Sequence, residues 1–149
     1  LVTEFNYATG DRNPNDRVVN TFDQIYPTNH GIYGLTDQMA RRNTRNVRTG
    51  VWMRPRSWLM VRAAHHAFWL ASRYDALYQF NGAASIPAVA GGAGSTYVGR
   101  EVDLSFDWKR SPYYSVGTQF GYFWSGTFVR QNSPGSNRLF YALYMDFKL

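Results

Sequence analysis

The sequence predicts an all-β protein, an antiparallel transmembrane β-barrel to which this chain of 149 residues contributes six strands. Apolar and polar residues alternate over long stretches, which is typical of strands that differ in environment between their two faces. Short and long connections between these stretches also alternate. Aromatic residues make up 17% of the chain and gather near the ends of the stretches.

The C-terminal stretch 138–149 shows the alternation most clearly. Its apolar set comprises Leu139, Tyr141, Leu143, Met145, Phe147 and Leu149. The residues between them include Arg138, Asp146 and Lys148. A strand with one wholly apolar face and one charged face suits a sheet that has lipid on one side and water on the other.

Five earlier stretches repeat this pattern, and at roughly 9–15 residues the strands are long enough for tilted spans of a bilayer. The side chains expected to face outward are Thr3, Phe5 and Tyr7; Val47, Thr49, Val51 and Met53; Leu59, Val61, Ala63, Ala67 and Trp69; Val98, Val102, Leu104, Phe106 and Trp108; and Tyr114, Val116, Thr118, Phe120, Tyr122, Trp124 and Phe128. The opposite face carries Glu101, Asp103 and Asp107 on one stretch. Three acids on one strand face indicate that this face is in contact with water.

The connections support the same interpretation. Residues 54–57 and 109–112 form tight turns, whereas residues of about 10–45, 72–96 and 130–137 form long loops. In outer-membrane barrels the short turns are periplasmic and the long loops extracellular. Aromatic girdles are expected at both membrane interfaces. They would comprise Trp58, Trp108, Tyr113 and Tyr114 beside the turns, and Trp69, Tyr74, Tyr78, Tyr97 and Trp124 at the other end. The alternative is a soluble β-sandwich with an aromatic core.

Six strands cannot close a barrel, because closure needs about eight and an open edge leaves backbone groups unpaired in lipid. We therefore expect the remaining barrel strands to lie outside this chain. The chain begins within an alternating segment, without a basic leader, and is interpreted as the C-terminal part, residues 1–149, of one outer-membrane β-barrel domain. Alternatively, several copies contribute strands to one pore. The uncharged runs 76–99 and 111–129 contain glycine and proline, which argues against transmembrane helices.

The charged face predicts an anion-conducting surface. The chain has 16 basic and 10 acidic residues, with a formal net charge of +6. The residues expected to line the pore are Arg48, Arg62, His66, Glu101, Asp103, Asp107, Lys109, Arg138 and Lys148. Guanidinium groups bind carboxylates through two parallel hydrogen bonds, and a series of them would let a polyuronate move from site to site. The alternative is that these charges are solvated wall residues and internal ion pairs.

The first long loop carries a second group of candidate residues, which we expect to form a gate that folds inward or over the mouth. This group comprises Arg41, Arg42, Arg45, Asp23 and His30. Nearby, Asp11, Asn13 and Asn15 have the spacing of a calcium loop. The following glycine is absent, and Phe22 occupies the place of the closing glutamate. Simple turn formation is therefore favoured over a calcium site.

Enzymatic and nucleic-acid functions are not expected. The chain has no cysteine and no nucleophile-elbow, phosphate-loop or dinucleotide-binding motif, so no cofactor is predicted. His65 and His66 are adjacent and point to opposite strand faces, which suits neither metal chelation nor a zinc-protease motif. No spacing favours a pairing of Ser105 or Ser125 with His66. The basic residues are spread over several strands and loops rather than clustered, which argues against nucleic-acid binding.

Several segments together resemble the alginate export family of bacterial outer-membrane porins. They are 7–11 (YATGD), 21–30 (TFDQIYPTNH), 33–37 (YGLTD), 66–71 (HAFWLA), 75–78 (DALY), 98–103 (VGREVD) and 121–126 (GYFWSG). The resemblance implies an eighteen-stranded barrel in the outer membrane of a Gram-negative bacterium, in contact with lipid and lipopolysaccharide. It also implies passive export of an anionic polysaccharide, or passage of small anions, through an arginine-rich lumen. The alternatives are a general or structural porin without a dedicated substrate and a soluble carbohydrate-binding sandwich.

Overall fold

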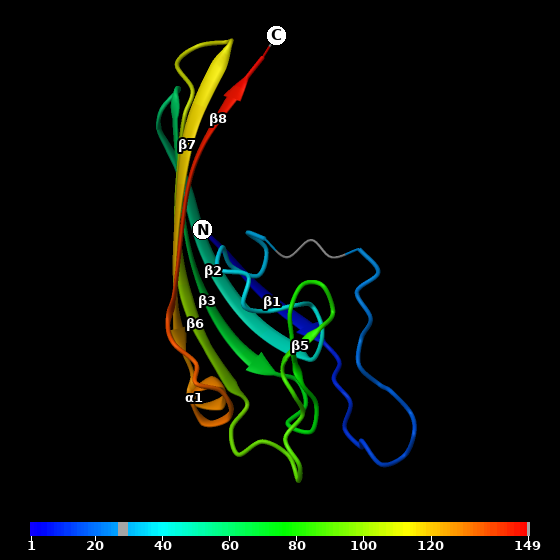
Figure 1. The fold of residues 1–149 in the computed structure, drawn as a ribbon. Coiled ribbons are helices and arrows are strands. Elements are labelled where there is room, and N and C mark those ends of the chain that lie inside the picture. The colour runs from blue at the N-terminus through cyan, green and yellow to red at the C-terminus, as the bar shows by residue number, and fades with distance from the viewer. Residues whose placement is uncertain (27–29, 149) are drawn as a thin grey trace.

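In the computed structural model, which describes residues 1–26 and 30–148, six long strands form one curved antiparallel sheet (Figure 1). In spatial order the strands are β1 (Val2–Ala8), β2 (Thr44–Arg56), β3 (Leu59–Leu70), β6 (Tyr97–Trp108), β7 (Tyr114–Ser125) and β8 (Arg138–Phe147). Each strand pairs with its neighbours in an antiparallel register. The predicted all-β antiparallel arrangement is confirmed.

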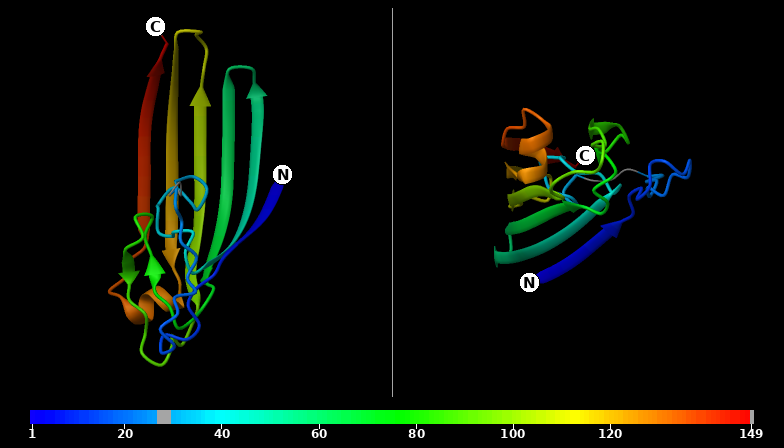
Figure 2. Two further views of the ribbon diagram at one scale, coloured as in Figure 1. Left: turned by 90° about the vertical axis from the view of Figure 1, so that its right-hand side faces the viewer. Right: turned by 90° about the horizontal axis from the view of Figure 1, so that it is seen from below.

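The connections alternate in length, as expected, and this places them at opposite ends of the sheet. Residues 57–58 join β2 to β3 and residues 109–113 join β6 to β7, at what we call the turn end (Figure 2). The three long connections, residues 9–43, 71–96 and 126–137, leave the sheet at the opposite end, which we call the loop end. Part of the first long connection runs back along the concave face of the sheet.

The long connections contain secondary structure of their own. β4 (Leu77–Tyr78) and β5 (Ala84–Ile86) form a small antiparallel sheet, and α1 (Thr127–Asn132) follows β7. Among the described residues, no helix has both the length and the apolar character needed to cross a bilayer.

The two faces of the large sheet are mostly those predicted. Val61, Phe106, Thr118 and Leu143 follow one another across four strands on the convex face. Exposed large side chains cover this face, among them Phe5, Val47, Val51, Met53, Phe106, Phe120, Leu139, Tyr141, Leu143, Met145 and Phe147. Leu149, which was also expected to face outward, lies outside the described residues.

Two of the predicted outward-facing residues are instead buried, so these two predictions were wrong. Val98 lies in the hydrophobic core because the β3–β6 register shifts between Phe68 and Trp69, opposite Gly99. A one-residue irregularity of this kind transfers a side chain to the other face. Phe128 belongs to α1, because the strand ends before Gly126.

Gly126 explains this strand end. Its amide donates to the Val98 carbonyl at 2.6 Å, and the backbone of β6 leaves no space there for a β-carbon. The chain turns at this contact, and the Arg130 amide then donates to the Gly126 carbonyl at 3.1 Å, within the first turn of α1.

The hydrophobic core lies at the loop end, between the concave face and the long connections. It comprises Tyr33, Met39, Phe68, Leu70, Leu77, Ile86, Ala93, Val98, Phe123, Phe128 and Val129. These residues come from all three long connections and from the adjoining ends of β3, β6 and β7. The core therefore fixes the loops to the sheet.

Replacing Phe128 with alanine should destabilise this core. The side chain is completely buried, so its removal should cost about 3–5 kcal/mol. Thermal unfolding of the full-length protein, followed by circular dichroism, should show a lower midpoint. Phe22, 45% exposed in the first loop, is the matched control, and Phe22→Ala should leave the midpoint almost unchanged. Equal midpoints for the two variants would contradict this account.

Candidate functional site

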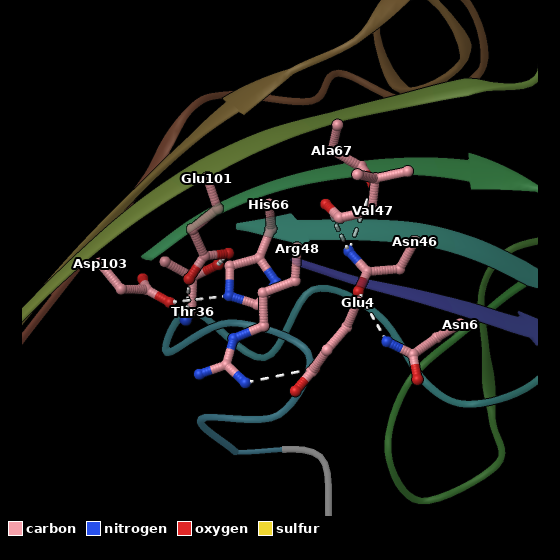
Figure 3. Close-up of polar contacts among 10 residues, drawn as sticks. All are labelled: Glu4, Asn6, Thr36, Asn46, Val47, Arg48, His66, Ala67, Glu101 and Asp103. Carbon is pink, nitrogen blue, oxygen red and sulfur yellow. Dashed lines mark hydrogen bonds and ion pairs between the residues drawn. The ribbon is translucent and has the colours of Figure 1, made fainter. Parts of the chain in front are cut away.

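One row of paired residues on the concave face crosses all six strands and brings charged side chains into line. The row consists of Glu4, Arg48, His66, Glu101, Phe123 and Arg138. Arg48 Nη1 lies 3.3 Å from Glu4 Oε2, and His66 Nε2 lies 3.4 Å from Asp103 Oδ2 (Figure 3). The inward orientation of Arg48, His66 and Glu101 agrees with the strand alternation.

The first loop covers part of this row. The Thr36 amide donates to Glu101 Oε1 at 2.8 Å, and the Thr36 hydroxyl donates to Glu101 Oε2 at 2.5 Å (Figure 3). Both carboxyl oxygens of the fully buried Glu101 are therefore hydrogen-bonded, as a buried polar group requires. Part of the first loop therefore lies against the concave face, and its role as a gate stays a prediction.

Gly34 permits this close approach. It has a φ of +88°, and a β-carbon at this position would lie 2.6 Å from the Glu101 carboxylate. Only glycine fits such a backbone conformation at such a distance without strain. The loop also reaches β8, where the ring of His30 meets that of Phe140 edge-on at 5.2 Å between centroids.

A second cluster lies nearer the turn end. Arg62 Nη2 forms an ion pair with Asp107 Oδ2, and the Tyr144 hydroxyl donates to Asp107 Oδ1. Both oxygens of Asp107 are therefore engaged, and the Arg62 guanidinium is held by a partner while its side chain remains 49% exposed. This is the internal ion pairing that was considered as the alternative role for these charges.

Three predicted bases take no part in these ion pairs. Lys109 and Lys148 line a hollow at the turn end together with Arg54 and Arg110. Arg138 lies at the loop end of β8 and is exposed. None of these five bases forms an ion pair with a carboxylate of the described residues.

The predicted gate residues make three contacts in the loops, two of which lie within the first loop. Arg41 Nε donates to the Tyr33 hydroxyl at 3.2 Å, and its guanidinium lies over the Tyr33 ring. Burial raises the pKa of Tyr33, so the phenol is neutral at physiological pH and can accept this hydrogen bond. His30 Nδ1 lies 2.9 Å from Asp37 Oδ2.

The other contact joins the first and second loops. Arg42 Nη1 lies 3.3 Å from Asp23 Oδ1, and its guanidinium stacks over the Tyr78 ring. The Tyr78 hydroxyl donates to Asp75 Oδ1 at 2.7 Å, and burial, with this bond, raises the pKa of Tyr78 to about 12. Tyr78 was predicted to belong to an outer aromatic girdle, but it belongs to this loop cluster instead.

Arg45 lies outside the loop. It is the second residue of β2, pairs with Tyr7 and Trp69, and donates from Nε and Nη2 to the Leu70 carbonyl at 3.1 and 3.0 Å. The loop thus ends two residues earlier than expected, since strand pairing begins at Thr44.

The calcium-like segment forms turns. Asp11 Oδ1 accepts from the Asn13 amide at 3.1 Å, and Asn13 Oδ1 accepts from the Asn15 amide at 3.3 Å. These are the side-chain-to-backbone bonds typical of Asx turns. Within the described parts of the chain, no group of three or more acidic, histidine or cysteine side chains could hold a metal ion.

Two residues that organise these contacts, Thr36 and Asp75, were not among the predicted site residues. They make contacts between segments far apart in the chain, which no local pattern predicts. The alternation of the last strand predicts that Tyr144 lies on the face opposite Leu143, as the structure shows. The contact of Tyr144 with Asp107 depends on the tertiary structure.

Replacing Gly34 with alanine should release the loop from Glu101. The new β-carbon would meet the carboxylate, and the two hydrogen bonds from Thr36 would be lost. Each bond is worth about 0.5–1.5 kcal/mol, so loss of the two should accelerate exchange of the Thr36 amide by roughly fivefold to a hundredfold. Hydrogen–deuterium exchange of the full-length protein measures this.

Gly31 provides the matched control for this experiment. It also has a positive φ, +75°, but a β-carbon added to it would find no other atom within 4 Å. Gly31→Ala therefore introduces similar backbone strain without displacing the loop from Glu101. Equal acceleration of Thr36 exchange in the two variants would contradict the proposed contact.

The comparison with protein families identifies the chain. The sequence model of the family described as Alginate export matches residues 1–141. Neither the curated proteins nor the solved structures include a significant match to the chain. The matched range includes β1–β7, α1 and the first residues of β8, and hence all of the charged row. The chain therefore belongs to the alginate export family, an outer-membrane transport family that suggests a polysaccharide export channel.

Proposed function

We propose that the concave face of this sheet lines the pore of a larger outer-membrane barrel, and that the pore passively exports an alginate-like anionic polysaccharide. The observation that carries the proposal is the division of the sheet into a charged concave face and an apolar convex face. Family membership supports the export function. The remaining strands of the barrel pair with the free edges of β1 and β8.

The convex face supports a lipid environment. Leu143 is 69% exposed, and the exposed apolar residues around it extend along β7 and β8. Soluble proteins rarely expose an apolar surface of this extent. In a barrel the same surface meets hydrocarbon, while the backbone groups are paired between strands.

The concave face supports the passage of anions because two of its acids, Glu101 and Asp107, are engaged by partners within the chain. Thr36 covers Glu101, and Asp107 is held by Arg62 and Tyr144. The guanidinium groups of Arg48 and Arg62 line a hollow of 310 Å³ beside the first loop. A passing carboxylate therefore meets the half-exposed Arg62 guanidinium, while Asp107 is shielded by its own partners.

The transport requires weak and repeated binding. Each guanidinium can bind one uronate carboxylate through two hydrogen bonds and then release it to the next base along the pore. Arg138 at the loop end and the basic hollow at the turn end extend this series toward both mouths. Because binding at each base is reversible and no covalent step is proposed, the concentration gradient of the polymer drives its movement.

Replacing Arg62 and Arg138 together with alanine should lower the preference for anions. Two positive charges leave the pore wall, and Asp107 loses its basic partner. Reversal potentials in planar bilayers give the anion-to-cation permeability ratio. The matched control is Arg100→Ala, because Arg100 lies on the convex face over the ring of Trp124.

Two results of these recordings are decisive. An unchanged permeability ratio in the double variant would contradict the assignment of Arg62 and Arg138 to the pore. Block of the single-channel current by added oligouronate separates a polyuronate channel from a general porin, since only the former binds the polymer as it passes.

Replacing Leu143 with arginine tests the lipid contact directly. A charged residue on the lipid face costs about 2–4 kcal/mol near the bilayer midplane. Its neighbour Ala142 lies on the concave face, so Ala142→Arg should cost much less. Unfolding of the full-length protein from lipid vesicles by urea measures both. Similar small losses for the two variants would indicate water on both faces and would favour the soluble sandwich.

A further inference from the structure

A pocket of 470 Å³ lies at the loop end, apart from the hollow beside Arg48 and Arg62. Residues of the first loop, the β4–β5 sheet, α1 with the segment that follows it, and the loop-side ends of β6, β7 and β8 surround it. Its size falls within the range of small-molecule sites, about 300–1,000 Å³. All of its walls come from this chain.

The polar groups of the pocket include both a free cation and a free acceptor. The exposed Arg138 guanidinium forms no ion pair among the described residues. Asp37 binds His30 through Oδ2, whereas its Oδ1 is buried and has no hydrogen-bond partner in the described parts of the chain. The Asp37 side chain as a whole is 38% exposed, so a ligand that donates a hydrogen bond can reach its carboxylate.

The rest of the lining is partly apolar and partly hydroxylated. Phe80, 54% exposed, stands at the pocket together with Leu77 and Ile86, and hydroxyl groups come from Ser133 and Ser136. An apolar wall with a few converging polar groups is typical of ligand sites. A sugar ring matches this lining because it presents C–H groups on its faces and hydroxyl groups at its edge.

We propose that this pocket is a binding site for a carboxylated pyranose, a single uronate unit held at the loop-end mouth of the pore. Arg138 binds the carboxylate, a sugar hydroxyl donates to Asp37, and Phe80 packs against the ring. That the uronate belongs to the exported polymer rests on the proposed function. The site deepens that function by giving the polymer a defined contact as it leaves the barrel.

The test measures binding of an oligomannuronate of four residues to the full-length protein in detergent by calorimetry, with the neutral tetramannose as the second probe. Phe80→Ala should weaken binding by roughly threefold to tenfold, the effect of an aromatic contact. Phe22→Ala, which removes an exposed loop phenylalanine outside the pocket, should leave it unchanged. Ser136→Trp fills the pocket and should reduce the fitted number of oligomannuronate binding sites by one.

Two outcomes would overturn the site. An oligomannuronate isotherm unaltered by both Phe80→Ala and Ser136→Trp would show that the uronate binds elsewhere, and equal affinity for the neutral probe would exclude recognition of the carboxylate. Conductance separates these results from the proposed function. If the channel is anion-selective but the pocket variants do not change oligomannuronate binding, the proposed function is supported and the proposed site is refuted. Loss of a site in Ser136→Trp without anion-selective conductance would support the site and refute the function.

Discussion

The structure depends on one constraint, the difference between the two faces of a single sheet. The convex face exposes large apolar side chains along most of its strands, whereas the concave face carries ionisable groups in register from strand to strand. A backbone whose side chains alternate in direction can satisfy both conditions only if its two sides meet different surroundings. The curvature of the sheet, its free edges and the position of the loops are consistent with a section of barrel wall.

The concave face would be unstable if its charges were buried without partners. The first loop solves this problem at Glu101, whose two carboxylate oxygens accept hydrogen bonds from Thr36. The loop can reach that position because the core at the loop end fixes it there through Tyr33 and Met39. Packing at one end of the sheet therefore determines which charges remain exposed in its middle.

This arrangement gives a physical basis for the export function of the family. Glu4 and Asp107 hold Arg48 and Arg62 in place, so these acids position the bases more than they repel an anion. Arg138 is left without an acidic partner among the described residues and lies beside the pocket at the loop end. The bases thus differ in their availability, and a polymer in transit would meet the most available ones near the mouths of the pore.

Sequence alternation alone determined the strands and the face of the sheet on which most side chains lie, because side-chain direction in a strand repeats every two residues. The segments between the alternating stretches then gave the order of short and long connections. The sequence also carried the resemblance to the family, which the family model confirms. The tertiary structure decided the exceptions: Val98 is turned inward by a register shift, Phe128 is buried after a turn at Gly126, and Tyr78 is drawn into the loops. Thr36 meets Glu101 across 65 residues of sequence, a contact that only folding of the whole chain brings about.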